Sequence, residues 1–186
     1  EKGIGIIHQE IVLVPYLTVA QNLFLGREIK TKFGTVDMRE TNRRAGEMLA
    51  NLGVNIHPDT LVESLTIAQQ QMVEIVKAVS FDGRIIVMDE PTSALDYGNT
   101  VRVLSTIRSL AREGLSILQS THQPDQAFLY SDRTLVLNRG RVLAFGRPQD
   151  VITRELISEI YHVDVEVNSL YDDRVRVCVP MQEIER

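Results

Sequence analysis

Short apolar runs alternate with longer amphipathic stretches along this chain, which is the pattern of an α/β protein. Residues 4–7 are apolar and β-branched, and the apolar run 84–88 lies between Gly83 and an acidic pair. We predict a buried strand at 4–7 and a fully buried central parallel strand at 84–88. Further strands are expected at 116–120, 134–138 and 142–145, with a small β pair at 163–167 and 175–179.

Helices are predicted where apolar residues recur at every third or fourth position. Thr18 is expected to cap the first of them, and either Ser64 or Thr66 to cap the third. Residues 139–141, Arg-Gly-Arg, indicate a tight hairpin turn. The predicted helices cover 18–25, 39–52, 67–79, 99–111 and 124–130, and two short helices follow in the C-terminal part.

The order of these elements predicts a parallel sheet covered by helices, in which ligands bind beyond the carboxyl ends of the strands. The mainly helical segment at about 17–80 is interpreted as an insert between strands. No linker rich in Gly, Pro or Ser separates two full domains. We therefore expect one main domain at 1–147 and a small α+β extension at 148–186.

Composition narrows the possible functions. With 186 residues, 44% of them hydrophobic, the chain is long enough for one domain with a real core. Its net charge of -5 provides no broad positive field, which disfavours nucleic acid as a partner. The single cysteine, Cys178, excludes an intramolecular disulfide and is interpreted as structural. No apolar stretch approaches the length of a membrane span, so any membrane role would be peripheral.

The strongest candidate for chemistry is the acidic pair at the end of the predicted central strand. Adjacent carboxylates are costly there unless a metal-bound nucleotide uses them, and the alternative is two solvated acids at a strand end. Residues 85–96, Ile-Ile-Val-Met-Asp-Glu-Pro-Thr-Ser-Ala-Leu-Asp, resemble the Walker B motif and D-loop of ABC ATPases over their whole length. The resemblance implies that Asp89 helps to hold Mg²⁺, that Glu90 polarises the attacking water, and that Asp96 belongs to the ATP site.

Residues 64–72, Ser-Leu-Thr-Ile-Ala-Gln-Gln-Gln-Met, resemble the ABC signature in the divergent form of monosaccharide importers. In the common form, two glycines occupy the positions of Ile67 and Ala68. The resemblance implies that Thr66 and the amides behind it bind the γ-phosphate held by an opposite subunit, so the site exists only in a sandwich dimer. The alternative is an ordinary Gln-rich helix start. The ATP-binding residues implied here are Ser64, Leu65, Thr66, Ile67, Ala68 and Gln69.

Two further residues, Gln9 and His122, are assigned roles because of their order along the chain. Gln9 follows the first strand and precedes 17–23, Leu-Thr-Val-Ala-Gln-Asn-Leu, an arrangement similar to the Q-loop of the family. The resemblance implies that Gln9 contacts ATP-bound Mg²⁺ or the attacking water and senses a transmembrane partner. His122 follows the strand after the acidic pair, as the switch histidine of the family does, and would be catalytic by positioning the water with Glu90. Either residue in isolation would carry no such meaning.

No G-x-x-x-x-G-K-[ST] pattern occurs in the sequence, so the backbone amides and lysine of a Walker A loop are missing from it. We therefore expect the chain alone to bind ATP poorly, and its ATP hydrolysis is left open. The resemblance otherwise covers almost the whole chain, which is interpreted as an N-terminally truncated P-loop NTPase-like domain. Such a loss would leave an unpaired sheet edge or an exposed core.

The chain as a whole resembles the ATP-binding subunits of ABC importers. The part through Ala94 resembles those of sugar importers. Residues 97–99, 122–128 and 143–146, together with 155–161 and Val163, resemble those of iron-siderophore or cobalamin importers. Iron-chelate or cobalamin uptake is favoured, because that resemblance continues through the C-terminal extension, and sugar uptake is the other possibility. The resemblance implies ATP and Mg²⁺ as cofactors and a peripheral position on the cytoplasmic face of the membrane. The implied partners are permease subunits, a second ATP-binding subunit and, indirectly, a substrate-binding protein.

Two other classes of function are considered. A soluble ABC-type ATPase of DNA repair or translation would need a coiled-coil arm or basic surfaces, and the sequence shows neither. A non-catalytic regulatory or assembly module is the more serious alternative, because the Walker A pattern is missing. Such a module would supply Thr66 and its helix to the nucleotide of a complete partner and would hydrolyse nothing itself.

Overall fold

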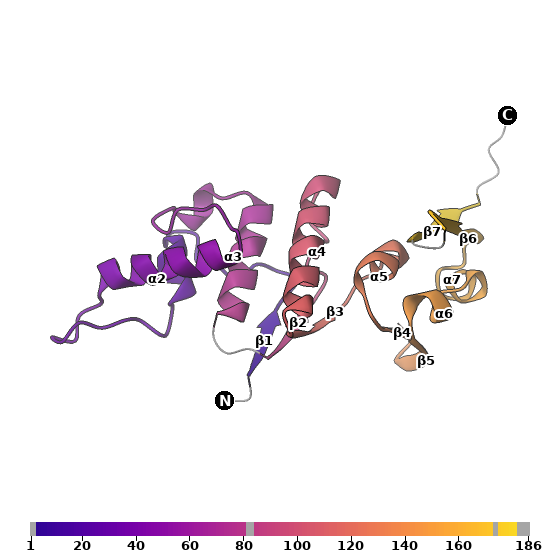
Figure 1. Cartoon of the computed structure of the whole chain (residues 1–186), viewed down its shortest axis with the longest axis horizontal. Helices are drawn as coiled ribbons and strands as arrows, with labels where there is room; N and C mark the ends of the chain where they lie inside the picture. The colour runs from indigo at the N-terminus through magenta and orange to yellow at the C-terminus, as the bar shows by residue number, and fades with distance from the viewer. Residues whose placement is uncertain (1–2, 81–83, 173–174, 182–186) are drawn as a thin grey trace. The chain divides into compact units, whose positions relative to one another are not determined.

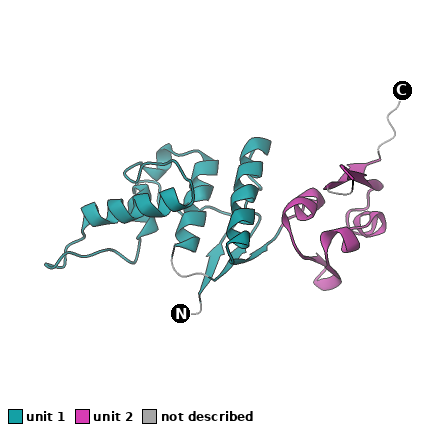
Figure 2. Ribbon diagram, viewed as in Figure 1, with its two compact units in different colours: residues 1–120 teal, residues 121–186 magenta. Residues whose placement is uncertain are grey.

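The computed structural model describes residues 3–80, 84–172 and 175–181, and the chain forms two compact units (Figure 2). Unit 1 is Glu1–Ser120 and unit 2 is Thr121–Arg186. The predicted domain boundary between residues 147 and 148 lies inside unit 2. Because compactness alone does not define a domain, that boundary stays a prediction.

A three-stranded parallel sheet lies in unit 1 (Figure 1). The strands, in the order in which they lie side by side, are β1 (Ile4–Ile7), β2 (Ile85–Met88) and β3 (Ser116–Gln119). Their register pairs Ile7 with Met88 and Met88 with Gln119. The three carboxyl ends therefore lie together at one edge of the sheet, and the predicted parallel sheet is confirmed.

The helix that leads into β2 is α3 (Ile67–Val79), and the helix between β2 and β3 is α4 (Tyr97–Arg112). Both connections run in the same direction across the sheet, and right-handed crossovers then place both helices on the same face. Helix α3 lies so close to β1 that a Cβ atom at Gly5 would come within 3.3 Å of the carbonyl oxygen of Ala78. A side chain at position 5 would therefore push α3 away from β1 by a few tenths of an ångström, so this close approach favours glycine.

The sheet is buried on one face only. In β2, Ile86 is 0% exposed, whereas its neighbour Ile85 is 41% exposed. On the same face as Ile85, Ile6 of β1 is 60% exposed and Leu118 of β3 is 64% exposed. The predictions of a fully buried central strand and of a buried first strand are therefore wrong. The reason is that α3 and α4 both cover the other face.

A helical insert lies between β1 and β2, as predicted. Besides α3, it contains α1 (Val19–Leu23), α2 (Met38–Asn51) and the 3₁₀ turn η1 (Val62–Ser64). Thr18 is the N-cap of α1 and Thr66 is the N-cap of α3, and each forms a capping box. In each box the threonine hydroxyl accepts from the backbone N–H of a glutamine, and the side chain of that glutamine accepts from the backbone N–H of the threonine. The insert has a core of its own, formed by Leu13, Val19, Ala20, Leu23, Phe24, Ala45, Leu49, Val62, Leu65, Val73 and Val76.

Unit 2 is a small α+β unit. Its elements are α5 (Pro124–Tyr130), β4 (Thr134–Asn138), β5 (Arg141–Gly146), α6 (Pro148–Val151), α7 (Arg154–Tyr161), β6 (Val165–Leu170) and β7 (Val175–Pro180). The alternation of helices and strands predicted that 134–138 continues the parallel sheet, but β4 pairs antiparallel with β5 instead. Arg139 and Gly140 between them have φ angles of 47° and 74°, so the predicted tight turn is confirmed.

Helix α5 is joined to the last hairpin through a side chain. Asp125 accepts a hydrogen bond of 2.8 Å from the backbone N–H of Cys178. Burial raises the pKa of the Cys178 thiol to about 11, which keeps the thiol protonated and fits a structural role. Among the described residues, no helix is both long and apolar enough to cross a bilayer.

The one-sided sheet gives a prediction for two adjacent residues. Replacing Ile86 with Ala leaves a cavity under α3 and α4, and we expect it to lower the free energy of unfolding by about 2–5 kcal/mol. Replacing Ile85 with Ala removes a half-exposed side chain and should cost less than about 1 kcal/mol. Urea unfolding of both variants measures the difference. Equal losses would mean that both faces are packed.

Candidate functional site

Polar residues gather where the three parallel strands end. The backbone N–H of Asp89 donates to the carbonyl oxygen of Ile7 at 3.0 Å, and that of Ser120 donates to the carbonyl oxygen of Met88 at 3.0 Å. Gln9 is exposed in the loop that begins directly after Ile7. The structure therefore brings the Gln9 loop, the acidic pair and the end of β3 to the same edge of the sheet, where ligands of such sheets bind.

Ser120 joins the two acidic residues. Its hydroxyl donates to Oδ1 of Asp89 at 2.6 Å and accepts from the backbone N–H of Glu90 at 2.9 Å. Glu90 has a φ of 42°, a left-handed value that costs a residue other than glycine on the order of 1–3 kcal/mol. The bond from its N–H to Ser120 helps to hold this conformation. Ser120 was not among the predicted site residues, although it is the last residue of the predicted strand 116–120 and lies two positions before His122.

The chemistry of this edge fits a magnesium ion that arrives with a nucleotide. Mg²⁺ prefers oxygen ligands and is usually bound by one or two carboxylates together with substrate phosphates. Asp89 offers an exposed carboxylate, and Gln9 offers an amide oxygen from the neighbouring strand end. In the described ranges, no three His, Cys, Asp or Glu side chains form a metal cluster. Magnesium binding by Asp89 and Gln9 therefore stays a prediction that the donor chemistry supports.

The predicted signature residues form a tightly bonded turn at the start of α3. The N–H of Thr66 donates to Oε1 of Gln69 at 2.9 Å, and the N–H of Gln69 donates to Oγ1 of Thr66 at 3.3 Å. Gln70 fixes Leu65, the residue before Thr66, because the side-chain amide of Gln70 donates to the carbonyl oxygen of Leu65 at 3.0 Å. Thr66 is thus the cap of α3, and the exposed, positively polarised start of this helix suits an anion.

The remaining predicted signature residues differ in their surroundings. The hydroxyl of Ser64 donates to the carbonyl oxygen of Leu61 at 2.7 Å, so Ser64 closes η1 and is not the cap of α3. Leu65 is buried in the core of the insert. Ile67 is 48% exposed and Ala68 is half-buried. The binding of ATP by this turn stays a prediction.

Asp96 has a structural role in this chain. Its carboxylate accepts from the backbone N–H of Asn99 at 2.8 Å and from the side-chain amide of Asn99 at 2.7 Å, and so caps α4. The backbone hydrogen bond from Asn99 lowers the pKa of this carboxyl below its ordinary value. The predicted contact of Asp96 with ATP is not tested by this geometry and stays a prediction.

His122 belongs to unit 2, where it lies shortly before α5. Its carbonyl oxygen accepts a hydrogen bond of 3.0 Å from the hydroxyl of Tyr161 on α7. This contact fixes the backbone at His122 within unit 2. The approach of the His122 imidazole to Glu90 of unit 1 stays a prediction.

Helix α3 carries a buried acid that is not among the predicted site residues. Glu74 is on α3 and is 9% exposed. Burial raises the pKa of its carboxyl, and the positive charge of Lys77 opposes this shift. Oε1 of this carboxyl has no hydrogen-bond partner among the described residues.

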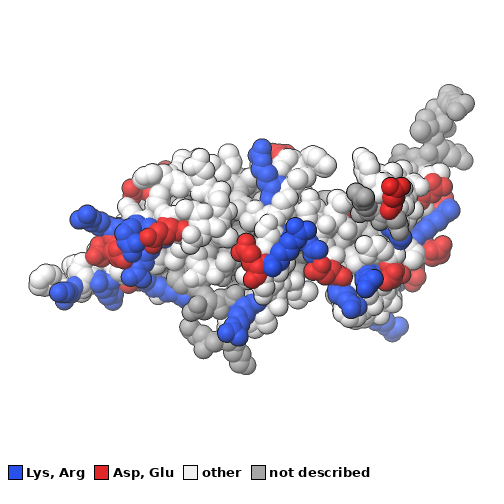
Figure 3. Space-filling model, in the orientation of Figure 1, with Lys and Arg blue, Asp and Glu red and all other residues white. Residues whose placement is uncertain are grey.

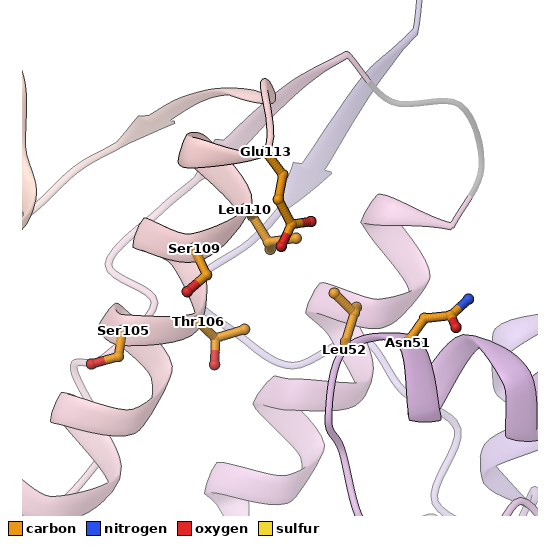
Figure 4. Close-up of a pocket in the computed structure, with 7 residues that line it drawn as sticks. All are labelled: Asn51, Leu52, Ser105, Thr106, Ser109, Leu110 and Glu113. Carbon is orange, nitrogen blue, oxygen red and sulfur yellow. The ribbon is translucent and has the colours of Figure 1, made fainter.

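Other surface features lie apart from these residues. Figure 3 shows positive and negative side chains intermixed on the face in view, including the region around α2. A shallow pocket in unit 1 contains none of the predicted site residues (Figure 4). It is lined by Asn51, Leu52, Ser105, Thr106, Ser109, Leu110 and Glu113.

Comparisons with known proteins agree with the residue pattern. The profile of the ABC transporter family matches residues 1–93. A Burkholderia ambifaria protein named as a ribose/galactose/methyl galactoside import ATP-binding protein is 45% identical over 158 residues, which are 85% of this chain and 30% of that protein. A ribose import ATP-binding protein of Caldanaerobacter subterraneus is 39% identical over 155 residues, covering 83% of this chain and 31% of that protein. The chain thus spans about 30% of the length of these relatives.

Two solved structures share the fold. A metal-chelate type ABC transporter in an inward-facing conformation matches 98% of this chain and 74% of its own, with a TM-score of 0.83 and 26% identity. CbiO1 of Clostridium perfringens, part of the ABC transporter complex cbiONQ, matches 87% of this chain and 64% of its own, with a TM-score of 0.68 and 25% identity. The predicted fold class is confirmed by these matches.

Glu74 gives a prediction about pH. Because its pKa is raised in the folded state, the folded chain holds this proton more tightly than the unfolded chain does. The stability that Glu74 contributes is therefore complete below the ordinary value of 4.5 and is lost as the pH rises through the raised pKa. We expect Glu74→Gln to flatten this decline and to be more stable than the unaltered chain at neutral pH.

Urea unfolding from about pH 4 to about pH 8 measures this effect. Glu63→Gln is the matched control, because Glu63 is an exposed acid of the same helical insert. A pH dependence that is equal in Glu74→Gln and in the unaltered chain would contradict the assignment.

Proposed function

We propose that this chain, which belongs to the ABC transporter family, is part of the ATP-binding subunit of a bacterial sugar importer. ATP hydrolysis by that subunit would supply the energy for import. The observation that carries the proposal is the sheet edge at which Asp89, Glu90 and the Gln9 loop lie together. The relatives named above as sugar-import ATP-binding proteins support the importer class. The divergent signature turn at Thr66 supports it independently of the strand edge.

Nucleotide-bound Mg²⁺ would supply the positive charge that stabilises the transferred phosphoryl group. Asp89 and Gln9 are the residues proposed to hold this ion. Glu90 would orient and polarise the attacking water, since its backbone is fixed by Ser120. His122 would position the same water from the second unit. The first turn of α3, with the capping box at Thr66, would face the γ-phosphate of an opposite subunit.

The proposed partners follow from the same site. A second ATP-binding subunit is required, because the start of α3 acts on a nucleotide held by the other subunit. Permease subunits and, indirectly, a substrate-binding protein complete an importer, and they place the chain peripherally on the cytoplasmic face of the membrane. CbiO1, which is part of a transporter complex, has the same fold and supports this assembly.

Sugar is the proposed cargo, and an iron chelate or cobalamin is the competing one. The sugar-importer relatives match 85% and 83% of this chain, which includes most of unit 2. The metal-chelate type transporter resembles the chain in fold at 26% identity. We expect disruption of the gene to slow growth on ribose or galactose and not on a ferric chelate or cobalamin. Loss of growth on the metal chelate alone would reverse the assignment.

A second candidate function rests on one sequence observation. The chain contains no G-x-x-x-x-G-K-[ST] pattern, so it lacks within these 186 residues the loop that grips the phosphates. In the alternative, the chain contributes Thr66 and α3 to the nucleotide of a complete partner without hydrolysing ATP itself. The two functions differ in whether Glu90 of this chain matters.

The test joins the chain to an N-terminal segment that supplies a G-x-x-x-x-G-K-[ST] loop and measures ATP turnover. We expect Mg²⁺-dependent hydrolysis that Glu90→Gln reduces by about 10²–10⁴-fold, because a positioned general base contributes about that much. Glu113→Gln is the control, since Glu113 is an exposed acid at the C-cap of α4. Hydrolysis that is unaffected by Glu90→Gln would contradict catalysis by this acid. The non-catalytic alternative is favoured if the chain without the joined segment stimulates ATP hydrolysis by a complete partner and this stimulation depends on Thr66 alone.

A further inference from the structure

The segment that carries His122 is held by a closed ring of three hydrogen bonds. The hydroxyl of Thr121 donates to Oε1 of Gln126 at 3.0 Å. The side-chain amide of Gln126 donates to Oε1 of Gln123 at 2.8 Å, and the backbone N–H of Gln123 donates to the hydroxyl oxygen of Thr121 at 3.1 Å. Thr121 and Gln123 are the two neighbours of His122 in the sequence. The ring therefore ties the residues on both sides of His122 to one side chain of α5.

Gln126 is the buried member of this ring. It is 6% exposed, whereas His122 and Gln123 are exposed. A buried side-chain amide is costly unless it is hydrogen-bonded, and here its oxygen accepts and its nitrogen donates within the ring. Hydrogen bonds are also stronger in a buried environment than in water. Gln126 thus provides a fixed point from which the loop is held.

A second contact reaches the backbone of His122 itself. The hydroxyl of Tyr161, at the end of α7, donates to the carbonyl oxygen of His122 at 3.0 Å. Helices α5 and α7 are packed together, because Ala127 and Phe128 of α5 share a buried core with Ile157 of α7. The ring and the tyrosine therefore hold His122 from two helices that share one core.

The backbone that follows His122 has little freedom of its own. Gln123 precedes Pro124, and a proline disfavours the helical conformation in the residue before it. Gln123 is accordingly extended, with φ of -106° and ψ of 105°, and Pro124 is the first residue of α5. The side chain of His122 is exposed, so a fixed backbone restricts the directions in which its imidazole can point.

We propose that Gln126 and Tyr161 are positioning residues for His122, which they hold through the hydrogen-bond ring and through the bond to its carbonyl oxygen. The inference rests on the proposed function, in which His122 positions the attacking water. Orientation matters there, because a displacement of about 1 Å can lower a catalytic rate by about 10²-fold. Gln126 and Tyr161 were not among the predicted site residues, and neither has to touch the nucleotide in this role.

NMR relaxation of the full chain tests the ring without a nucleotide. Thr121→Val and Gln126→Met keep the approximate side-chain volume and remove bonds of the ring. We expect the order parameter of the His122 amide to fall from about 0.85 to below about 0.6 in both variants. Carbon relaxation of the His122 imidazole should show the same loss of order. Thr121→Ser keeps the hydroxyl and should retain the order of the unaltered chain.

Tyr161→Phe tests the second contact with a milder change. It removes one hydroxyl from a side chain that is 44% exposed, so unit 2 is expected to stay folded. We expect a smaller fall in order at His122 than in Gln126→Met. Tyr171→Phe is the matched control, because Tyr171 is a tyrosine of the same unit that is 77% exposed. It should leave the signals of His122 unchanged.

ATP turnover of the joined protein separates positioning from a merely structural role at the start of α5. Thr121→Val and Gln126→Met should lower kcat by roughly tenfold or more and change KM for ATP by less than about twofold. This split is expected because the ring would act on the orientation of a catalytic group and not on the binding of ATP. Thr121→Ser should rescue kcat.

Two results would overturn the inference. If His122 keeps its order in Thr121→Val, Gln126→Met and Tyr161→Phe, the ring and the tyrosine do not hold it. If His122 loses its order while kcat of the joined protein stays the same, holding His122 does not serve the reaction. A joined protein that hydrolyses no ATP in any form would count against the proposed function alone, because the NMR measurement decides whether His122 is held.

Discussion

The parallel register of β1, β2 and β3 is the constraint on which the rest of the site depends. It aligns Ile7, Met88 and Gln119 at one edge, and the backbone bonds from Asp89 to Ile7 and from Ser120 to Met88 continue the pairing beyond the strands. A shift of one strand by a single residue would reverse the faces of its side chains and separate these ends. The acidic pair is therefore placed by the sheet before any ligand binds.

The local signals in the sequence predicted most of the fold. Helix α3 begins and ends where it was predicted, because Thr66 forms a capping box and apolar residues recur at helical spacing through Val79. The hairpin turn at 139–140 also followed from local chemistry, since its residues adopt left-handed φ angles. The exposure of Ile85 could not be predicted locally, because it depends on which face of the sheet the distant helices cover.

The candidate site could be predicted only in part, because it too depends on which distant segments the fold brings together. The acidic pair and Gln9 could be found from their order along the chain, and the parallel sheet brings their strand ends together. Ser120 was missed as a member of the site because its partner is remote in sequence: the Ser120 hydroxyl donates to the carboxylate of Asp89. A polar side chain reveals such a role only when the fold shows what lies next to it.

The central claim is that a metal-bound nucleotide meets this chain at the carboxyl edge of the sheet. The most direct measurement is paramagnetic broadening of backbone NMR signals during titration with Mn²⁺·ATP. The account predicts that the signals of Gln9, Asp89, Glu90 and Ser120 broaden first, while those of Asn51 and Glu113 at the shallow pocket keep their intensity. Broadening that begins at the pocket, or that spreads evenly over the chain, would contradict the account.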